Sequence, residues 1–217
     1  LLMSANASLP LLYFTDVNKP SPITAPNFCM LLRKHIGNGR ILDITQPSLE
    51  RIVDIKVEHV DEMGDLKEKH LIIELMGKHS NIIFTNAEYM ILDSIKHVSA
   101  LVSSVREVLP GRDYFIPETM HKKDPKTLTL EDFEDSLNTH PYPLYKALYT
   151  SFTGFSPVLA SEICHRAGID PDIDTASLSS IAIARISLSA YSLITTGTSF
   201  NFASLAALHL LSPAIIS

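Results

Sequence analysis

The pattern of apolar and polar positions in the first half of the chain has the period of a β-strand. Along residues 50–60 the apolar residues Val53, Ile55 and Val57 alternate with mainly polar neighbours. Alternation with a period of two is typical of a strand that is buried on one face. Further apolar runs, separated by short polar breaks, lie at residues 11–14, 71–76, 81–85 and 89–95. Runs of this length and spacing predict an antiparallel meander.

One segment of the same half has a helical period instead. Counting from Phe28, apolar residues recur after three, four and eight positions, at Leu31, Leu32 and Ile36. This spacing predicts a helix over residues 26–36 that packs on the sheet. The basic residues near its C-terminal turn, which complement the helix dipole, are Arg33, Lys34 and His35.

After residue 117 the pattern becomes that of a helical protein. Residues 118–139 are acidic and predict a linker with a short helix that is capped near Thr129. Another helix is predicted over residues 143–152, and a further one runs from Ser156, which suits an N-cap, to Gly168, which suits a C-cap. We therefore predict an α+β protein with a β-rich domain over residues 1–117, an acidic linker over 118–139 and a helical module over 140–217.

Length and composition exclude several classes of protein. The chain has 217 residues, of which 46% are hydrophobic and 19% are charged. These values fit one large or two small globular domains and exclude an intrinsically disordered protein. None of the 8 glycines falls in a GxGxxG or GxxxxGK[ST] pattern, which excludes the standard dinucleotide-binding and P-loop sites. Cys29 and Cys164 form no CxxC pair, which argues against a zinc ribbon or a redox motif and fits a reducing cytoplasm.

The charge balance restricts any contact with nucleic acid to a local surface. Lys and Arg number 18 against 24 Asp and Glu, so the formal net charge is -6. Proteins that bind nucleic acid non-specifically usually carry a basic field. The N-terminal residues lack the features of a signal peptide, and the longest uncharged stretch, residues 186–208, is too polar to span a membrane. We expect a cytoplasmic protein without membrane contact and, because the chain begins as if inside a strand, a fragment.

No arrangement of residues in the sequence indicates catalysis or metal binding. GxSxG, HExxH and HxH motifs are all missing. Cys164 and His165 are adjacent, so on a helix their side chains point about 100 degrees apart and cannot act together. Cys29 and His35 lie on different helical faces and form no ligand set. We expect a binding protein rather than an enzyme, with no metal ion and no cofactor.

Glu50 and Arg51, at the beginning of a predicted strand, form the first candidate binding group. A carboxylate beside a guanidinium can present an acceptor and a forked pair of donors to the edge of a nucleobase. Arg33, Lys34 and other basic residues precede them closely in the sequence. Two simpler interpretations stay open, namely a solvated strand edge and an ion pair that fixes Arg51 for structural reasons alone.

A polar loop between two apolar strands, residues 76–81, is the second candidate. A hairpin turn explains its glycine and asparagine without any function. It does not explain Lys78 and His79, which are good donors to phosphate oxygens. Taken alone, the loop is a weak indication of nucleic-acid binding.

These segments resemble the N-terminal domain of the NFACT family, which includes bacterial RqcH and eukaryotic NEMF and was long called fibronectin-binding protein A. Residues 154–172 are also similar to the helix-two-turn-helix module of formamidopyrimidine-DNA glycosylases, and the β-rich part is similar to the N-terminal domain of those enzymes. In that module a helix N-terminus meets a phosphate, and Ser156 occupies the corresponding position. The motifs that carry the family resemblance lie in order at residues 26–36, 49–52, 76–83, 109–114, 154–157 and 165–168.

The resemblance implies a ribosome quality-control factor. Such proteins bind a large ribosomal subunit that holds a stalled peptidyl-tRNA and recruit alanyl-tRNA, so that the ribosome adds an alanine tail to the nascent chain. The acid–arginine pair with which the family engages tRNA falls on Glu50 and Arg51, where Glu50 replaces the usual Asp. The other residues of the expected tRNA patch are Arg33, Lys34, Lys78 and His79.

Two other classes of function are weighed against this one. The older family name implies a surface adhesin that binds fibronectin, although the sequence shows neither a signal peptide nor a cell-wall sorting signal. A DNA repair enzyme related to the glycosylases would need an N-terminal proline nucleophile and a zinc finger, and neither is visible.

Overall fold

The described residues of the computed structural model form two compact units. The structure describes the whole chain apart from residues 18, 117–121, 140 and 196–217. The first unit contains residues 1–47 and 51–116, and the second contains residues 48–50 and 122–195. The boundary that we predict near residue 120 falls among residues outside the described part of the chain.

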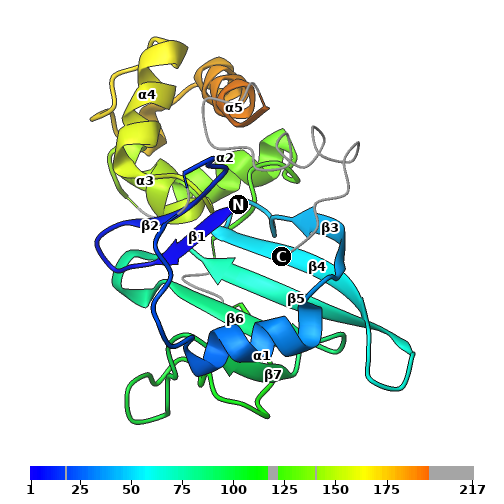
Figure 1. Cartoon of the computed structure of the whole chain (residues 1–217). Helices are drawn as coiled ribbons and strands as arrows, with labels where there is room; N and C mark the ends of the chain where they lie inside the picture. The colour runs from blue at the N-terminus through cyan, green and yellow to red at the C-terminus, as the bar shows by residue number, and fades with distance from the viewer. Residues whose placement is uncertain (18, 117–121, 140, 196–217) are drawn as a thin grey trace. The chain divides into compact units, whose positions relative to one another are not determined.

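A five-stranded antiparallel sheet forms the centre of the first unit (Figure 1). Each strand pairs with the next one in the sequence, which confirms the predicted meander. A separate two-stranded sheet joins β1 (Leu2–Ala5) to β2 (Pro10–Tyr13). The strands of the larger sheet are β3 (Arg40–Thr45), β4 (Ile52–Val60), β5 (Leu66–Glu74), β6 (Asn81–Asn86) and β7 (Ile91–Ser94).

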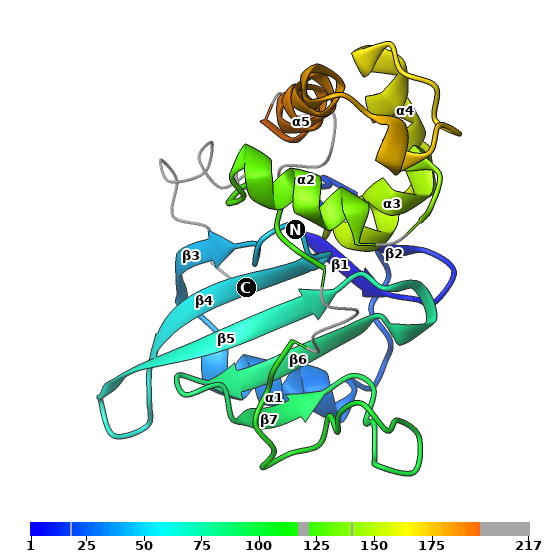
Figure 2. The same ribbon diagram turned by 180° about the vertical axis from the view of Figure 1, so that it is seen from behind.

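Helix α1 (Asn27–Ile36) covers one face of this sheet, as predicted, and both views show it lying across the strands (Figures 1 and 2). Alternate residues of β4, β5 and β6 point toward it and form an apolar core. The opposite face carries a second, smaller core, which Val108 of the following loop completes. Its other fully buried members are Ile52, Ile72, Ile83 and Ile91.

Four helices form the second unit around a core of their own. Helix α2 (Leu130–Asn138) lies inside the predicted acidic linker, and its N-cap is Thr129, as expected. The Thr129 and Asp132 side chains bond reciprocally to backbone amides in a capping box. The remaining helices are α3 (Leu144–Ser151), α4 (Pro157–Ala167) and α5 (Ser180–Thr195), with a 3₁₀ turn, η2 (Thr175–Ser177), before α5.

Helix α4 has the ends that the sequence predicts. Ser156 caps its first turn, Pro157 is the first helical residue, and Gly168 ends it in the left-handed conformation, at φ 64°. Cys164 is fully buried in this helix while His165 is exposed, so the two do not act together. Burial raises the pKa of the Cys164 thiol to about 11, which keeps it protonated and unreactive at neutral pH.

None of the described helices is both long enough and apolar enough to cross a membrane.

Candidate nucleic-acid interface

Arg51 lies immediately before β4, and its side chain is exposed. Its backbone carbonyl accepts a hydrogen bond of 2.8 Å from the N–H of Leu75, which fixes the start of β4 against the end of β5. Within the described part of the chain, no carboxylate lies within ion-pair distance of its guanidinium. The five donors of Arg51 therefore face solvent, which is the state that a ligand-binding arginine requires.

Lys78 and His79 lie in a 3₁₀ turn, η1 (Gly77–His79), that joins β5 to β6. Both side chains are exposed. Because Ile52 pairs with Glu74 in the β4–β5 register, this turn and Arg51 occur at the same end of the sheet. The structure thus brings two of the three predicted basic groups to one edge of the first unit.

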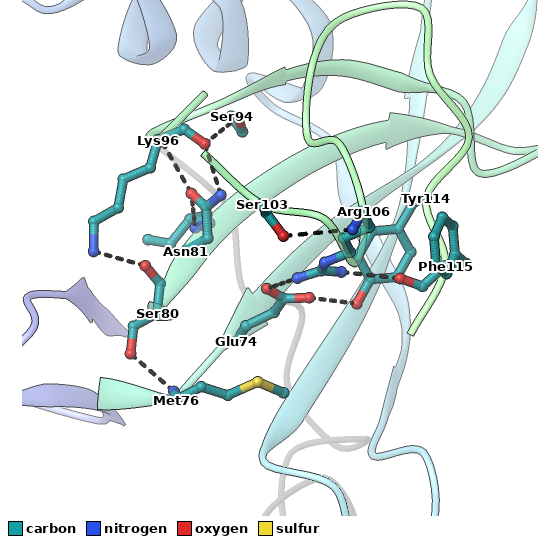
Figure 3. A network of polar contacts seen from close by, with 11 residues as sticks. Glu74, Met76, Ser80, Asn81, Ser94, Lys96, Ser103, Arg106, Tyr114 and Phe115 are labelled. Carbon is teal, nitrogen blue, oxygen red and sulfur yellow. Dashed lines mark hydrogen bonds and ion pairs between the residues drawn. The ribbon is translucent and has the colours of Figure 1, made fainter. Parts of the chain in front are cut away.

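A polar network under the turn holds its ends in place (Figure 3). The Ser80 hydroxyl accepts the N–H of Met76 at 2.8 Å, which closes the turn. The Lys96 ammonium donates to the carbonyls of Ser80 and Ala5, both at 2.7 Å. The Asn81 side chain bonds to the backbone of Lys96 at 2.8 and 3.0 Å. These hydrogen bonds fix the backbone on both sides of the exposed Lys78 and His79.

Glu74, the last residue of β5, anchors a second network nearby (Figure 3). Its fully buried carboxylate forms an ion pair with Arg106 and accepts the hydroxyl of Tyr114 at 3.0 Å. Burial favours a lower pKa for Arg106, but the hydrogen bond and charge of Glu74 outweigh it and raise that pKa. Burial, together with the charge of Glu74, also raises the pKa of Tyr114. The pair holds the 98–116 segment over the sheet.

A third group, which we did not predict, lies on the same face of the sheet as Glu74. The Asp54 carboxylate contacts His70 Nδ1 at 2.9 and 3.0 Å and accepts the hydroxyl of Tyr89 at 2.8 Å. Tyr89 contacts the His70 ring in a tilted arrangement, with 4.4 Å between the ring centroids, and has a φ of 62°. Burial and the hydrogen bond to Asp54 raise the pKa of Tyr89 to about 12. Charged residues inside otherwise apolar strands were the available signal for this group and for Glu74.

The structure does not bring Arg33 and Lys34 to the Arg51 edge. They lie in the last turn of α1, and the Lys34 ammonium is 3.4 Å from Glu62, in the hairpin that joins β4 to β5. Arg51 precedes the other end of β4, and a strand of nine residues spans about 30 Å. We predicted that Arg51 and at least one of the other two basic groups share one face, and the second group is the Lys78–His79 turn. Arg33 and Lys34 lie elsewhere, because the direction in which α1 crosses the sheet is not encoded in its own residues.

Glu50 and Ser156 belong to the second unit. Glu50 follows Leu49, whose side chain packs against the helical core. Leu49 also lies against Gly154, where a Cβ atom would be only 2.6 Å from the Cβ of Leu49, so the contact requires glycine. The Ser156 hydroxyl accepts the N–H of Leu159 at 3.1 Å, and its carbonyl accepts that of Ala160. Phosphate binding by this helix end stays a prediction, for which the N–H of Val158 and the Ser156 hydroxyl hydrogen remain as donors.

Comparison with known proteins establishes the family. Residues 1–207 match the family profile described as "NFACT N-terminal and middle domains". The chain belongs to the NFACT family. It is 41% identical over 170 residues to the Rqc2 homolog RqcH of Bacillus subtilis, a match that covers 78% of this chain and 30% of that protein. It is also 32% identical over 85 residues to the human protein "Ribosome quality control complex subunit NEMF", covering 39% of this chain and 7% of that one.

A solved structure of a similar chain supports the α+β fold. The N-terminal part of the fibronectin/fibrinogen-binding protein of Streptococcus suis superposes with a TM-score of 0.71 at 30% identity, and the match covers 87% of this chain and 67% of that one. The chain spans about a third of the length of the bacterial RqcH relatives that it matches.

Proposed function

We propose that this NFACT chain is the tRNA-binding part of a ribosome quality-control factor. The observation that carries the proposal is the exposed Arg51 guanidinium, which has no ion-pair partner among the described residues and lies at the same end of the sheet as the Lys78–His79 turn, on a protein of net charge -6. A forked guanidinium can read a base edge, while Lys78 and His79 can hold neighbouring phosphates. The names of the RqcH and NEMF relatives support the wider role.

In this proposal the chain positions tRNA and catalyses no reaction itself. The whole factor binds a large ribosomal subunit with a stalled peptidyl-tRNA in the cytoplasm, and alanyl-tRNA is its preferred ligand. The ribosome forms each peptide bond and so extends the nascent chain with alanine. The family resemblance assigns the role of acceptor to Glu50, which precedes Arg51 in the sequence and has a side chain one methylene longer than the family's usual Asp.

Fibronectin binding is the second candidate, because solved structures of similar chains carry fibronectin- and fibrinogen-binding names. The two candidate functions require different binding surfaces on the protein. A tRNA surface needs exposed cationic donors and weakens with added salt. An adhesin needs a surface that recognises an extended protein partner, for which no single group of residues stands out among those described.

Binding of the purified chain to both ligands tests the proposal. Fluorescence anisotropy with labelled tRNA should show saturable binding, whereas immobilised fibronectin should retain no more chain than an albumin-coated surface. For the full-length factor, co-sedimentation with large ribosomal subunits is expected. Saturable retention on fibronectin together with no detectable tRNA binding would reverse the order of the two candidates.

A further inference from the structure

A pocket lies at the end of the first unit away from Arg51. The last turn of α1 and the β4–β5 hairpin line an open surface pocket of about 370 Å³, which we call the hairpin pocket. Figures 1 and 2 show that this hairpin projects beyond the other strands of the sheet. The basic residues that line the pocket are Lys34, His35, His59, Lys67 and Lys69.

The sheet register explains why basic residues gather here. Val57 pairs with Lys69 and His59 pairs with Lys67, so these residues continue the row that is apolar further along the α1 face. The row changes from apolar to basic where α1 ends at Ile36. The last turn of the helix then adds two more basic side chains from the other side of the pocket.

Among the described residues, Lys69 lacks an anionic partner and the Nδ1 atom of His59 lacks any hydrogen-bond partner. Lys69 has no carboxylate within ion-pair distance among the described residues, and its Nζ lies 3.5 Å from Nδ1 of His35. Burial and the charge of Lys69 lower the pKa of His35, and burial lowers the pKa of Lys69 itself. The Nδ1 atom of His59 is buried and has no hydrogen-bond partner in the described part of the chain. Unsatisfied buried polar atoms of this kind are costly unless a ligand meets them.

The two carboxylates of the pocket do not neutralise this set. Asp61 accepts the backbone N–H groups of Met63 and Asp65, both at 2.9 Å, and so closes the hairpin. Glu62 is largely exposed and pairs only with the exposed Lys34. Lys67 pairs with Asp65 of the same hairpin at 3.4 Å, so Lys69 is the lining lysine without an ion pair among the described residues. Each protonated histidine of the pocket adds one positive charge. No group of three or more His, Cys, Asp or Glu side chains among the described residues has metal-binding geometry, so a cation is not the expected occupant.

We propose that the hairpin pocket binds a phosphate group, with Lys69 as its central ligand and His35 and His59 as further donors. A phosphate oxygen can accept from an ammonium and an imidazole at once, and its charge relieves the repulsion between neighbouring cationic groups. The phosphate belongs either to an RNA backbone or to a small free molecule. This site lies about 30 Å along β4 from Arg51 and does not depend on the tRNA surface proposed above.

Titration with inorganic phosphate, followed by ³¹P NMR, tests the proposal on the whole chain. The unmodified chain should show saturable binding, and Lys69→Gln should weaken it roughly tenfold or more. Lys126→Gln is the matched control, since it removes an exposed lysine of the second unit and should leave the affinity unchanged. No saturable binding, or equal affinity for Lys69→Gln and the control, would overturn the proposal.

A second variant guards against misfolding. Lys67 is exposed, so Lys67→Gln should fold as the unmodified chain does, which circular dichroism can verify, and should weaken phosphate binding severalfold. If Lys69→Gln is unfolded, the Lys67→Gln result decides, and unchanged affinity in that variant contradicts the proposal.

Sulfate, which stays a dianion between pH 6 and 8, isolates the contribution of the histidines. Binding should be tighter at pH 6, because an anion favours the protonated form of His35, whose pKa is lowered by burial and by the charge of Lys69. The other charged or titratable groups that act on His35 are Lys34 and Lys69, His59 and Glu62. Affinity that does not change with pH would contradict the role of the histidines.

A competition experiment between inorganic phosphate and tRNA distinguishes the two possible sources of the bound phosphate group. Displacement of inorganic phosphate by tRNA in both the unmodified chain and Arg51→Ala would assign the pocket to an RNA phosphate. Phosphate binding that tRNA leaves unchanged would assign it to a small molecule. Either result tests the hairpin pocket independently of the tRNA surface, because Arg51→Ala changes only the tRNA surface.

Discussion

Arg51 and Arg106 lie in the same unit, and their surroundings give them different roles. The Arg106 side chain is 12% exposed and is paired with the fully buried Glu74. Removing one partner of such a pair typically costs about 3–5 kcal/mol, so Arg106 acts as a structural residue. Arg51 is exposed, unpaired among the described residues and free to bind. The sequence singles out Arg51 by family resemblance, whereas Arg106 is recognisable only once the fold places it beside Glu74.

The hydroxyl of Tyr89 makes the stability of the first unit depend on pH. Its folded pKa of about 12 exceeds the value of about 10 expected in an unfolded chain. The bond from its hydroxyl to Asp54 therefore stabilises the fold fully below pH 10, and this stabilisation is lost as the pH rises toward 12. Urea unfolding should show that the stability gap between the unmodified chain and Tyr89→Phe shrinks between pH 9 and pH 11.5. A constant gap would mean that the hydroxyl does not hold its proton in this way.

At the scale of elements, the sequence predicts those strands whose burial alternates regularly. Strand β4 and the second half of β5 have apolar rows on the α1 face and were found where expected. Strand β3 was missed because a register shift between Ile41 and Asp43 breaks its alternation. The first half of β5 was missed because Leu66–Lys69 is mainly charged and exposed. The first half of β5 lies at the hairpin end of the sheet, and β3 runs along β4 from Glu58 to Asp54.

The capping box of α2 gives a prediction at the same scale. Replacing Thr129 with alanine removes the acceptor for the N–H of Asp132, at 3.1 Å, and should destabilise the second unit by about 1 kcal/mol. Thr139→Ala, at the other end of the helix, is the control, because the Thr139 hydroxyl bonds to a carbonyl of Asp135 and caps no amide. Urea unfolding monitored by circular dichroism should separate the two variants. Equal effects would show that the capping box does not contribute.

For the whole molecule, the decisive property is a small cationic surface on an acidic chain. Acidic surroundings suppress indiscriminate RNA binding, so affinity must come from a few contacts. If Arg51 contacts a base and Lys78 contacts a phosphate, the logarithm of the tRNA affinity should fall with the logarithm of salt concentration with a slope of about −1. Fluorescence anisotropy titrations with labelled tRNA at salt concentrations between about 50 and about 200 mM measure this slope. A slope several times steeper would reveal a much larger basic surface than the described residues provide.

The tRNA affinity of Arg51→Ala is the most direct test of the central claim, that the Arg51 edge of the sheet binds tRNA. Arg112→Ala removes an exposed arginine of the same unit, one that is paired with Glu107, and so matches the change in charge. The account predicts that Arg51→Ala loses about 1–3 kcal/mol of binding free energy, more for alanine tRNA than for other tRNAs. Lys78→Ala should lose less and affect all tRNAs alike, and Arg112→Ala should bind normally. Unchanged tRNA affinity in Arg51→Ala, or the same loss in Arg112→Ala, would contradict the account.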